Sequence, residues 1–145
     1  MVIPQPKHVR KTALKTIEIE ISINKDKLTE TAKIECDRQK LVLTFTMQSG
    51  LKKTYAASDL YICLGMLRAD FPDIKFLCKG AKLNVHPSRM SSQMAGGVVA
   101  YEVSMGKPAE QEDIVNIFDY EDTDITNDIE QQREFNRRWL ASLAH

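Results

Sequence analysis

The residues whose types and spacing could support chemistry lie in one acidic stretch near the C-terminus. Between Pro108 and Gln132 the chain has nine acidic residues and no lysine or arginine. Such a stretch can solvate a loop, bind a metal ion or face a cationic partner. The nine acids are Glu110, Glu112, Asp113, Asp119, Glu121, Asp122, Asp124, Asp128 and Glu130.

A metal site is the first role to consider. The segment DYEDTD, residues 119–124, places oxygen donors at alternate positions, as calcium loops do. An EF-hand loop also requires glycine at its sixth position and glutamate at its twelfth. With Asp119 as the first ligand, the sixth residue is Asp124 and the twelfth is Glu130, so the glycine is missing. We expect no dedicated metal site and no cofactor.

Catalysis has one candidate residue, His86, which precedes Pro87 and Ser88. General acid–base work also needs a group that orients the base. The sequence contains none of the motifs G-x-S-x-G, H-E-x-x-H or G-x-x-x-x-G-K-[ST]. We therefore expect no enzyme activity. A small enzyme with a site around His86 stays open as an alternative, and it would require a pocket in which His86 meets a carboxylate.

The charge of the chain is strongly divided, although its net charge is zero. Residues 1–107 carry 17 lysines and arginines and 10 acids, whereas residues 108–145 carry 3 and 10. The basic residues are spread among acids, and the aromatic residues form no evident stacking platform for RNA. A phosphate backbone would also be repelled by the acidic part. We expect no direct binding of nucleic acid.

Two explanations compete for the acidic stretch itself. The first turn of a helix attracts acids, which explains Asp128 and Glu130. Solvation alone does not explain the run from Glu110 to Asp124, because like charges repel and serine, asparagine or lysine would suit a loop equally well. No basic residue interrupts the run, so no counter-charge is evident in the sequence. A cationic partner is the interpretation we favour.

The elements that position this stretch follow from the hydrophobic pattern. The sequence IEIEISI alternates between Ile17 and Ile23, which predicts a strand with one solvated face. Residues 28–36 favour a strand over a helix, because Ile34 would leave the apolar face of a helix. Further strands are expected over residues 41–47, 51–56, 74–78, 98–104 and 114–118, with a short extended piece at 82–86 and a helical turn at 88–94.

Two helices are predicted. One begins with Ser58 as its N-cap and ends before Pro72. Gly65 inside it indicates a place where the helix presses closely on a sheet. The other covers residues 128–143, with a capping box that begins at Asn127. The expected fold class is α+β, an antiparallel sheet of about five to seven strands with two main helices packed on it.

The chain has the size of one domain, at 145 residues. Two prolines and four basic residues near the N-terminus predict a flexible basic arm over residues 1–13, followed by a single domain over 14–145. Three cysteines without a C-x-x-C pair indicate buried, reduced thiols: Cys36, Cys63 and Cys78. No stretch reads as a signal peptide or a membrane-spanning helix, so we expect a cytoplasmic protein without a membrane partner.

Residues 85–119 carry a family resemblance. The segment VHPSRMSSQMAGGVVAYEVSMGKPAEQEDIVNIFD combines V-x-P-S-x-M, a Gly-Gly break, VAYE, a G-K-P turn and VNIFD. In this order it resembles bacterial immunity proteins of contact-dependent growth inhibition and related polymorphic toxin systems. The resemblance covers about a quarter of the chain, and the family shares no catalytic motif.

The resemblance implies a function that fits the divided charge. Immunity proteins of this kind bind the C-terminal domain of a cognate toxin in the cytoplasm and block it, often by covering its active site. Many such toxins are nucleases, whose sites are basic because they hold phosphates. A protein-binding adaptor of a secretion or regulatory system is the alternative, and the oligomeric state stays open. The expected partner-binding residues are Asp119, Tyr120, Glu121, Asp122 and Asp124, with Tyr120 as an aromatic anchor.

Overall fold

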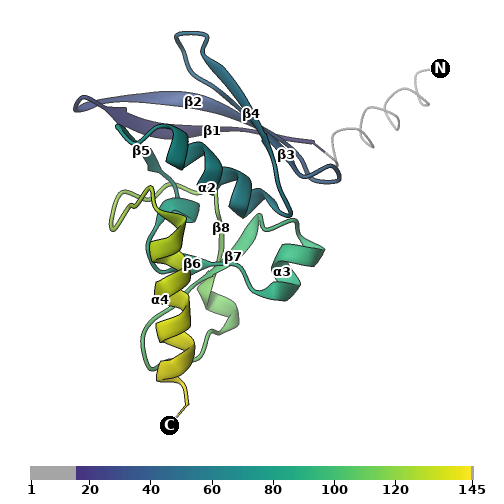
Figure 1. Cartoon of the computed structure of the whole chain (residues 1–145), viewed down its shortest axis with the longest axis vertical. Helices are drawn as coiled ribbons and strands as arrows, with labels where there is room; N and C mark the ends of the chain where they lie inside the picture. The colour runs from purple at the N-terminus through teal and green to yellow at the C-terminus, as the bar shows by residue number, and fades with distance from the viewer. Residues whose placement is uncertain (1–15, 145) are drawn as a thin grey trace, which may run out of the picture.

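The computed structural model describes residues 16–144 (Figure 1). Here eight strands form two antiparallel sheets, accompanied by two main helices, one short helix and two 3₁₀ turns. The predicted α+β class is confirmed, with the strands divided between a sheet of five and a sheet of three. The expected arm over residues 1–13 lies outside the described residues, so that boundary stays a prediction.

The larger sheet consists of β1 (Thr16–Lys25), β2 (Leu28–Asp37), β3 (Val42–Thr46), β4 (Lys52–Ala56) and β5 (Ile74–Leu77). Its strand order is β4-β3-β2-β1-β5, and all neighbours are antiparallel. The alternation predicted for β1 is confirmed, because Ile21 and Ile23 are buried while Glu18 and Glu20 are exposed. Residues 28–36 lie within β2, as the period of two predicts.

Helix α2 (Leu60–Asp70) covers the apolar face of this sheet (Figure 1). Its leucines Leu60, Leu64 and Leu67 are buried against the strands. The predicted N-cap at Ser58 is wrong by one residue. Asp59 has the extended backbone of a cap, and its carboxylate accepts a hydrogen bond from the amide of Ile62 at 2.8 Å.

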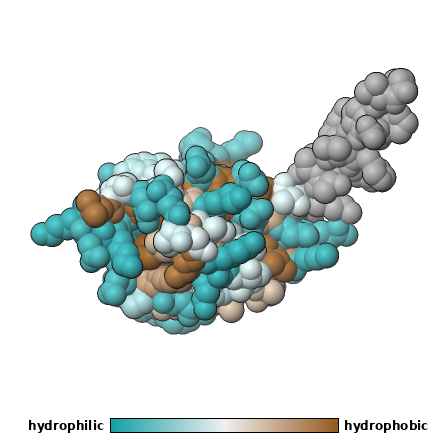
Figure 2. Space-filling model, turned by 90° about the horizontal axis from the view of Figure 1, so that it is seen from above, coloured by the Kyte–Doolittle hydropathy of each residue, from teal (hydrophilic) through white to brown (hydrophobic). Residues whose placement is uncertain are grey.

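The other face of the larger sheet is polar. Glu18 and Glu20 lie on it, and the hydroxyls of Thr44 and Thr54 on neighbouring strands are 3.1 Å apart. Figure 2 shows the molecule from above as mainly hydrophilic, with hydrophobic residues in small groups. The hydrophobic side chains of the sheet are therefore concentrated on the face that meets α2.

A second, smaller sheet follows β5 in the chain. It is built from β6 (Val85–His86), β7 (Val99–Glu102) and β8 (Ile114–Asn116), in that order. The short elements around it are η1 (Lys79–Ala81), α3 (Arg89–Met94) and η2 (Gln111–Asp113). Strand β8 is shorter than predicted, because Ile117 and Phe118 are buried in a turn beyond it.

Helix α4 (Ile129–Ser142) packs against β6 and confirms the predicted C-terminal helix. Its cap differs from the prediction. Asp128 is the N-cap and accepts from the amide of Glu130, whereas the side-chain amide of Asn127 donates to the carbonyls of Phe71 and Ile74. Asn127 therefore ties the start of α4 to the start of β5.

A buried polar junction joins the two main helices. Arg68 of α2 is fully buried and donates to the carbonyl of Gly80 at 2.8 Å and to Oε1 of Gln132 at 2.5 Å. Gln132 of α4 donates to the same Gly80 carbonyl at 2.9 Å. Gly65 presses on Ile129 of α4 and not on the sheet as predicted, since a Cβ there would lie 2.6 Å from Cδ1 of Ile129. The η1 turn is thus held between both helices.

Replacing Gly80 by alanine should destabilise this junction. A Cβ would lie 2.5 Å from Cδ2 of Leu64 and 2.8 Å from Cβ of Ile117. We expect Gly80→Ala to lower the free energy of unfolding by about 1–3 kcal/mol.

The matched comparison is Gly65→Ala, in which the clash is with the flexible end of Ile129 and alanine gains about 1 kcal/mol of helix propensity. It should cost clearly less than Gly80→Ala in urea unfolding followed by circular dichroism. A Gly80→Ala variant as stable as the parent would contradict the tight packing of the turn.

Candidate partner-binding site

The acidic loop, defined as residues 119–124, is fixed along its backbone. The amide of Lys79 donates to the carbonyl of Asp119 at 2.8 Å, and the amide of Glu121 donates to the carbonyl of Leu77 at 3.3 Å. At the far end the amide of Leu83 donates to the carbonyl of Asp124 at 2.9 Å. The loop therefore follows the β5–η1 segment, and backbone hydrogen bonds within the chain hold its shape.

Four of the five predicted contact residues face solvent. Asp119, Asp122 and Asp124 are exposed, and 59% of the surface of Tyr120 is accessible. The Tyr120 hydroxyl donates to the Asp122 carboxylate at 3.3 Å. The loop thus brings three carboxylates and one aromatic ring together on the surface.

Glu121 behaves differently, and here the expectation that the run lacks an intrinsic counter-charge is wrong. One oxygen of its carboxylate lies 2.9 Å from Nζ of Lys79 and 3.1 Å from Nζ of Lys82. The same two ammonium groups contact Glu102 of β7, at 2.8 and 2.9 Å. These four residues form a neutral cluster beneath the acidic loop.

The cluster shifts the pKa values of its members. Hydrogen bonds from Lys79 are the main cause that lowers the pKa of Glu121 to about 2, helped by the amide of Thr123 and by Lys82. Hydrogen bonds to Glu102 and Glu121 raise the pKa of Lys79. All four groups are therefore charged at neutral pH, and Glu121 acts as an anchor of the loop.

A sequence signal for this cluster exists in β7. The alternation of the segment places Glu102 on the same face as Val98 and Ala100, both of which are buried. A carboxylate on a buried face requires a cation or hydrogen-bond donors. Lys79 and Lys82 supply that cation.

The remaining acids of the stretch have other roles. Glu110 and Asp113 form a capping box around η2, in which the amide of Glu110 donates to the Asp113 carboxylate at 2.9 Å. Asp128 and Glu130 belong to the start of α4, as expected from the helix dipole. The acids left without such a role are all exposed: Glu112 of η2, and Asp119, Asp122 and Asp124 of the acidic loop.

The surroundings of His86 bear on the alternative that the chain is a small enzyme. It lines a cavity of about 340 Å³ together with Asp59. The Asp59 oxygens accept from the Ile62 amide and, at 2.5 Å, from the Ser92 hydroxyl, while Nδ1 of His86 donates to the Pro87 carbonyl at 2.7 Å. Across residues 16–144 no hydrogen bond joins His86 to a carboxylate, so this geometry lends the alternative no support.

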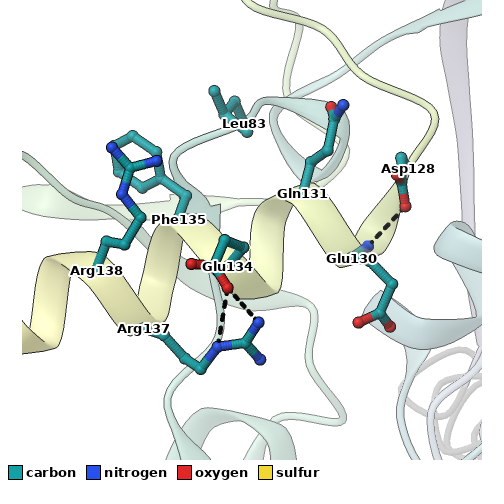
Figure 3. Close-up of a pocket in the computed structure, with 8 residues that line it drawn as sticks. All are labelled: Leu83, Asp128, Glu130, Gln131, Glu134, Phe135, Arg137 and Arg138. Atoms are coloured by element: carbon teal, nitrogen blue, oxygen red, sulfur yellow. Dashed lines mark hydrogen bonds and ion pairs between the residues drawn. The ribbon is translucent and has the colours of Figure 1, made fainter.

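A charged surface also runs along α4 and borders a cavity of about 550 Å³ (Figure 3). Figure 3 shows Arg137 turned towards Glu134, and the Asp128 carboxylate bonded to the amide of Glu130. Glu130 also pairs with Arg133. Arg138 is exposed and has no ion pair among the described residues. Because Glu130 and Glu134 are each paired with an arginine of the same helix, this surface does not present the concentrated negative charge of the acidic loop.

The three cysteines lie in the hydrophobic core. Cys36, Cys63 and Cys78 are free and buried, as predicted, and burial raises the pKa of Cys36 to about 12 and those of the other two to about 11.

Within the described range no group of three or more His, Cys, Asp or Glu side chains could hold a metal ion. No helix in the same range has the length and apolar character to span a membrane.

No family model matches this chain, and no curated protein matches it. The resemblance to immunity proteins therefore continues to depend on the pattern of residues 85–119, and the contact roles of the loop residues stay predictions.

The cluster predicts a specific dependence of stability on pH. The pKa of Glu121 is lowered to about 2 from its ordinary 4.5, so its carboxylate stabilises the fold at pH values above about 4.5. This contribution is lost as the pH falls towards 2. We expect Glu121→Gln to be less stable than the parent at pH 7, with a difference that shrinks between pH 4.5 and 2.

Asp122→Asn is the control, because this exposed neighbour pairs with no lysine or arginine among the described residues. Urea unfolding at a series of pH values measures all three proteins. An equal loss of stability on acidification in the parent and in Glu121→Gln would show that the cluster does not stabilise the fold.

Proposed function

We propose that this chain is a cytoplasmic immunity protein that binds the C-terminal domain of a cognate toxin and neutralises it. The observation that carries the proposal is the acidic loop, which presents Asp119, Tyr120, Asp122 and Asp124 to solvent while Glu121 is anchored from below. The loop covers a basic active site on the toxin, as expected for a nuclease.

The rigidity of the loop supports high affinity. Flexible loops lose conformational entropy when they bind, which weakens association. Here the loop is attached to the β5–η1 segment by backbone hydrogen bonds at Asp119, Glu121 and Asp124. Asp124 also has a left-handed backbone with φ of 56°, a conformation that aspartate and asparagine tolerate better than most residues. A preformed loop therefore loses little entropy at the interface.

The charges of the loop support rapid and selective association. Complementary charge can raise association rate constants to about 10⁸–10⁹ M⁻¹s⁻¹ at low salt. Three carboxylates within six residues produce a local negative field that attracts a phosphate-binding cleft. Tyr120, exposed at the same surface, supplies an aromatic side chain of the kind that is enriched at energetically dominant contacts.

The direct test is protection of cells. We expect the gene next to the one for this chain to encode the toxin domain. The two are expressed together, and growth is compared with cells that express the neighbouring gene alone. Rescue of growth together with a purified complex of the two proteins supports immunity. A stable complex that leaves toxin activity unchanged would instead support the adaptor, and absence of both would contradict the proposal.

The acidic loop should control the association rate. We expect the triple variant Asp119→Asn, Asp122→Asn, Asp124→Asn to associate with the toxin domain about tenfold more slowly or worse at low salt, with a weaker salt dependence. Asparagine preserves the left-handed backbone at position 124. Glu121 is left intact because it anchors the loop.

The matched control removes three exposed carboxylates elsewhere, in the variant Glu18→Gln, Glu20→Gln, Asp73→Asn. It has the same change in net charge, so a local effect of the loop is separated from the overall charge. Stopped-flow association at several salt concentrations measures both variants. Equal slowing in the two would mean that the loop is ordinary solvated surface.

A further inference from the structure

A groove distinct from the acidic loop lies between α4 and the smaller sheet. Its volume is about 580 Å³, within the range of small-molecule sites. Tyr101 and Val103 line it from β7 and the residue that follows, and Trp139 and Leu140 line it from α4. Two aromatic and two aliphatic side chains thus give the groove an apolar lining suited to a planar ring.

The groove is held in shape by hydrogen bonds at one end. The indole Nε1 of Trp139 donates to the carbonyl of Lys107 at 2.8 Å, and the amide of Gly106 donates to the hydroxyl of Ser142 at 2.8 Å. These bonds attach the loop after β7 to α4, and Ala109 of this loop also lines the groove. The indole therefore has a fixed orientation in the absence of a ligand.

The polar groups of the groove are few. His86 and Asn136 line it, together with Ser88. The carbonyl of Pro87 can only accept, so Nδ1 of His86 carries the proton of their 2.7 Å hydrogen bond. Burial lowers the pKa of His86, which keeps the ring neutral at pH 7 and leaves Nε2 as an acceptor. No hydrogen bond to Nε2 occurs within the part of the chain that the structure describes.

The charge of the lining has one sign. Arg89 is the charged residue of the groove, it is exposed, and it has no ion-pair partner in the described range. The adjoining cavity of about 340 Å³ shares His86 and Arg89 and adds Arg133. Its carboxylate, Asp59, already accepts two hydrogen bonds. A free guanidinium thus stands beside an apolar groove that offers no uncommitted carboxylate.

We propose that this groove binds a small planar aromatic anion, with the ring against Trp139 and Tyr101 and the anionic group at Arg89. Arginine recognises carboxylates and phosphates through paired N–H donors, and its planar cation also tolerates an aromatic neighbour. The site is independent of toxin binding by the acidic loop. Its ligand is defined by three features: a flat ring, one negative group and a size of one or two rings.

The chain offers a built-in reporter for this site, because Trp139 is its single tryptophan. Anilinonaphthalene sulfonate, an aromatic anion, serves as the probe, and its emission is excited by energy transfer from Trp139. We expect saturable binding with one probe per chain. Naphthoate and naphthyl phosphate, added as competitors, distinguish a carboxylate ligand from a phosphate ligand, and neutral naphthalenemethanol should displace the probe less well than the better of the two.

Arg89→Gln tests the role of the charge without disturbing the core, since Arg89 is exposed. Affinity for the anionic probe should fall by about fivefold or more, because hydrogen bonds to charged groups are among the stronger ones. Arg38→Gln is the matched control, an exposed arginine that lines neither cavity. Unchanged affinity in Arg89→Gln, equal losses in both variants, or no saturable binding by the parent would overturn the proposal.

Discussion

The carbonyl of Gly80 is the point on which the arrangement of the molecule depends. It accepts hydrogen bonds from Arg68 of α2 and from Gln132 of α4, so both helices are fixed to one short turn. Burial lowers the pKa of Arg68, and leaving a buried donor without its acceptor costs about 1–3 kcal/mol, or more when the donor is charged. The turn also carries Lys79 and precedes Lys82, whose ammonium groups lie under the acidic loop. Core packing therefore determines the positions of the two lysines that bind Glu121 of the loop.

The cluster of four charges connects this turn to the acidic loop at the surface. Glu121 and Glu102 meet the two lysines at 2.8–3.1 Å, which pulls one acid of the loop inward. The backbone around Glu121 lies against the β5–η1 segment, whereas Asp119, Asp122 and Asp124 remain exposed to solvent. An exposed ion pair contributes little, but a partly buried network with several hydrogen bonds is screened less by solvent. The inward acid thus holds the loop in a shape that exposes the others.

Local sequence patterns predicted the helices and strands well, but they did not predict contacts between residues that are far apart in the sequence. The strict alternation over residues 17–23 specifies a strand because each isoleucine gains burial only on one face. The cap prediction missed by one residue, since Ser58 and Asp59 are both good caps and the choice depends on backbone geometry. The pairing of Lys79 with Glu121 joins residues 42 positions apart, and nothing in the spacing of either indicates it. This pairing can be predicted only when the strand registers of both sheets and the position of the η1 turn are known.

The charges of the cluster cancel one another, and this affects which surfaces the acidic loop attracts. Two ammonium and two carboxylate groups cancel inside it, so neither lysine remains to balance Asp119, Asp122 or Asp124. In the free protein, water and salt screen these three carboxylates, over about 8 Å at physiological ionic strength. A polyanion such as DNA or RNA is repelled by them, whereas a cleft lined by lysine and arginine replaces the lost screening with direct contacts. The same internal pairing that stabilises the loop therefore leaves three carboxylates that favour a cationic surface, which is the kind of partner we propose.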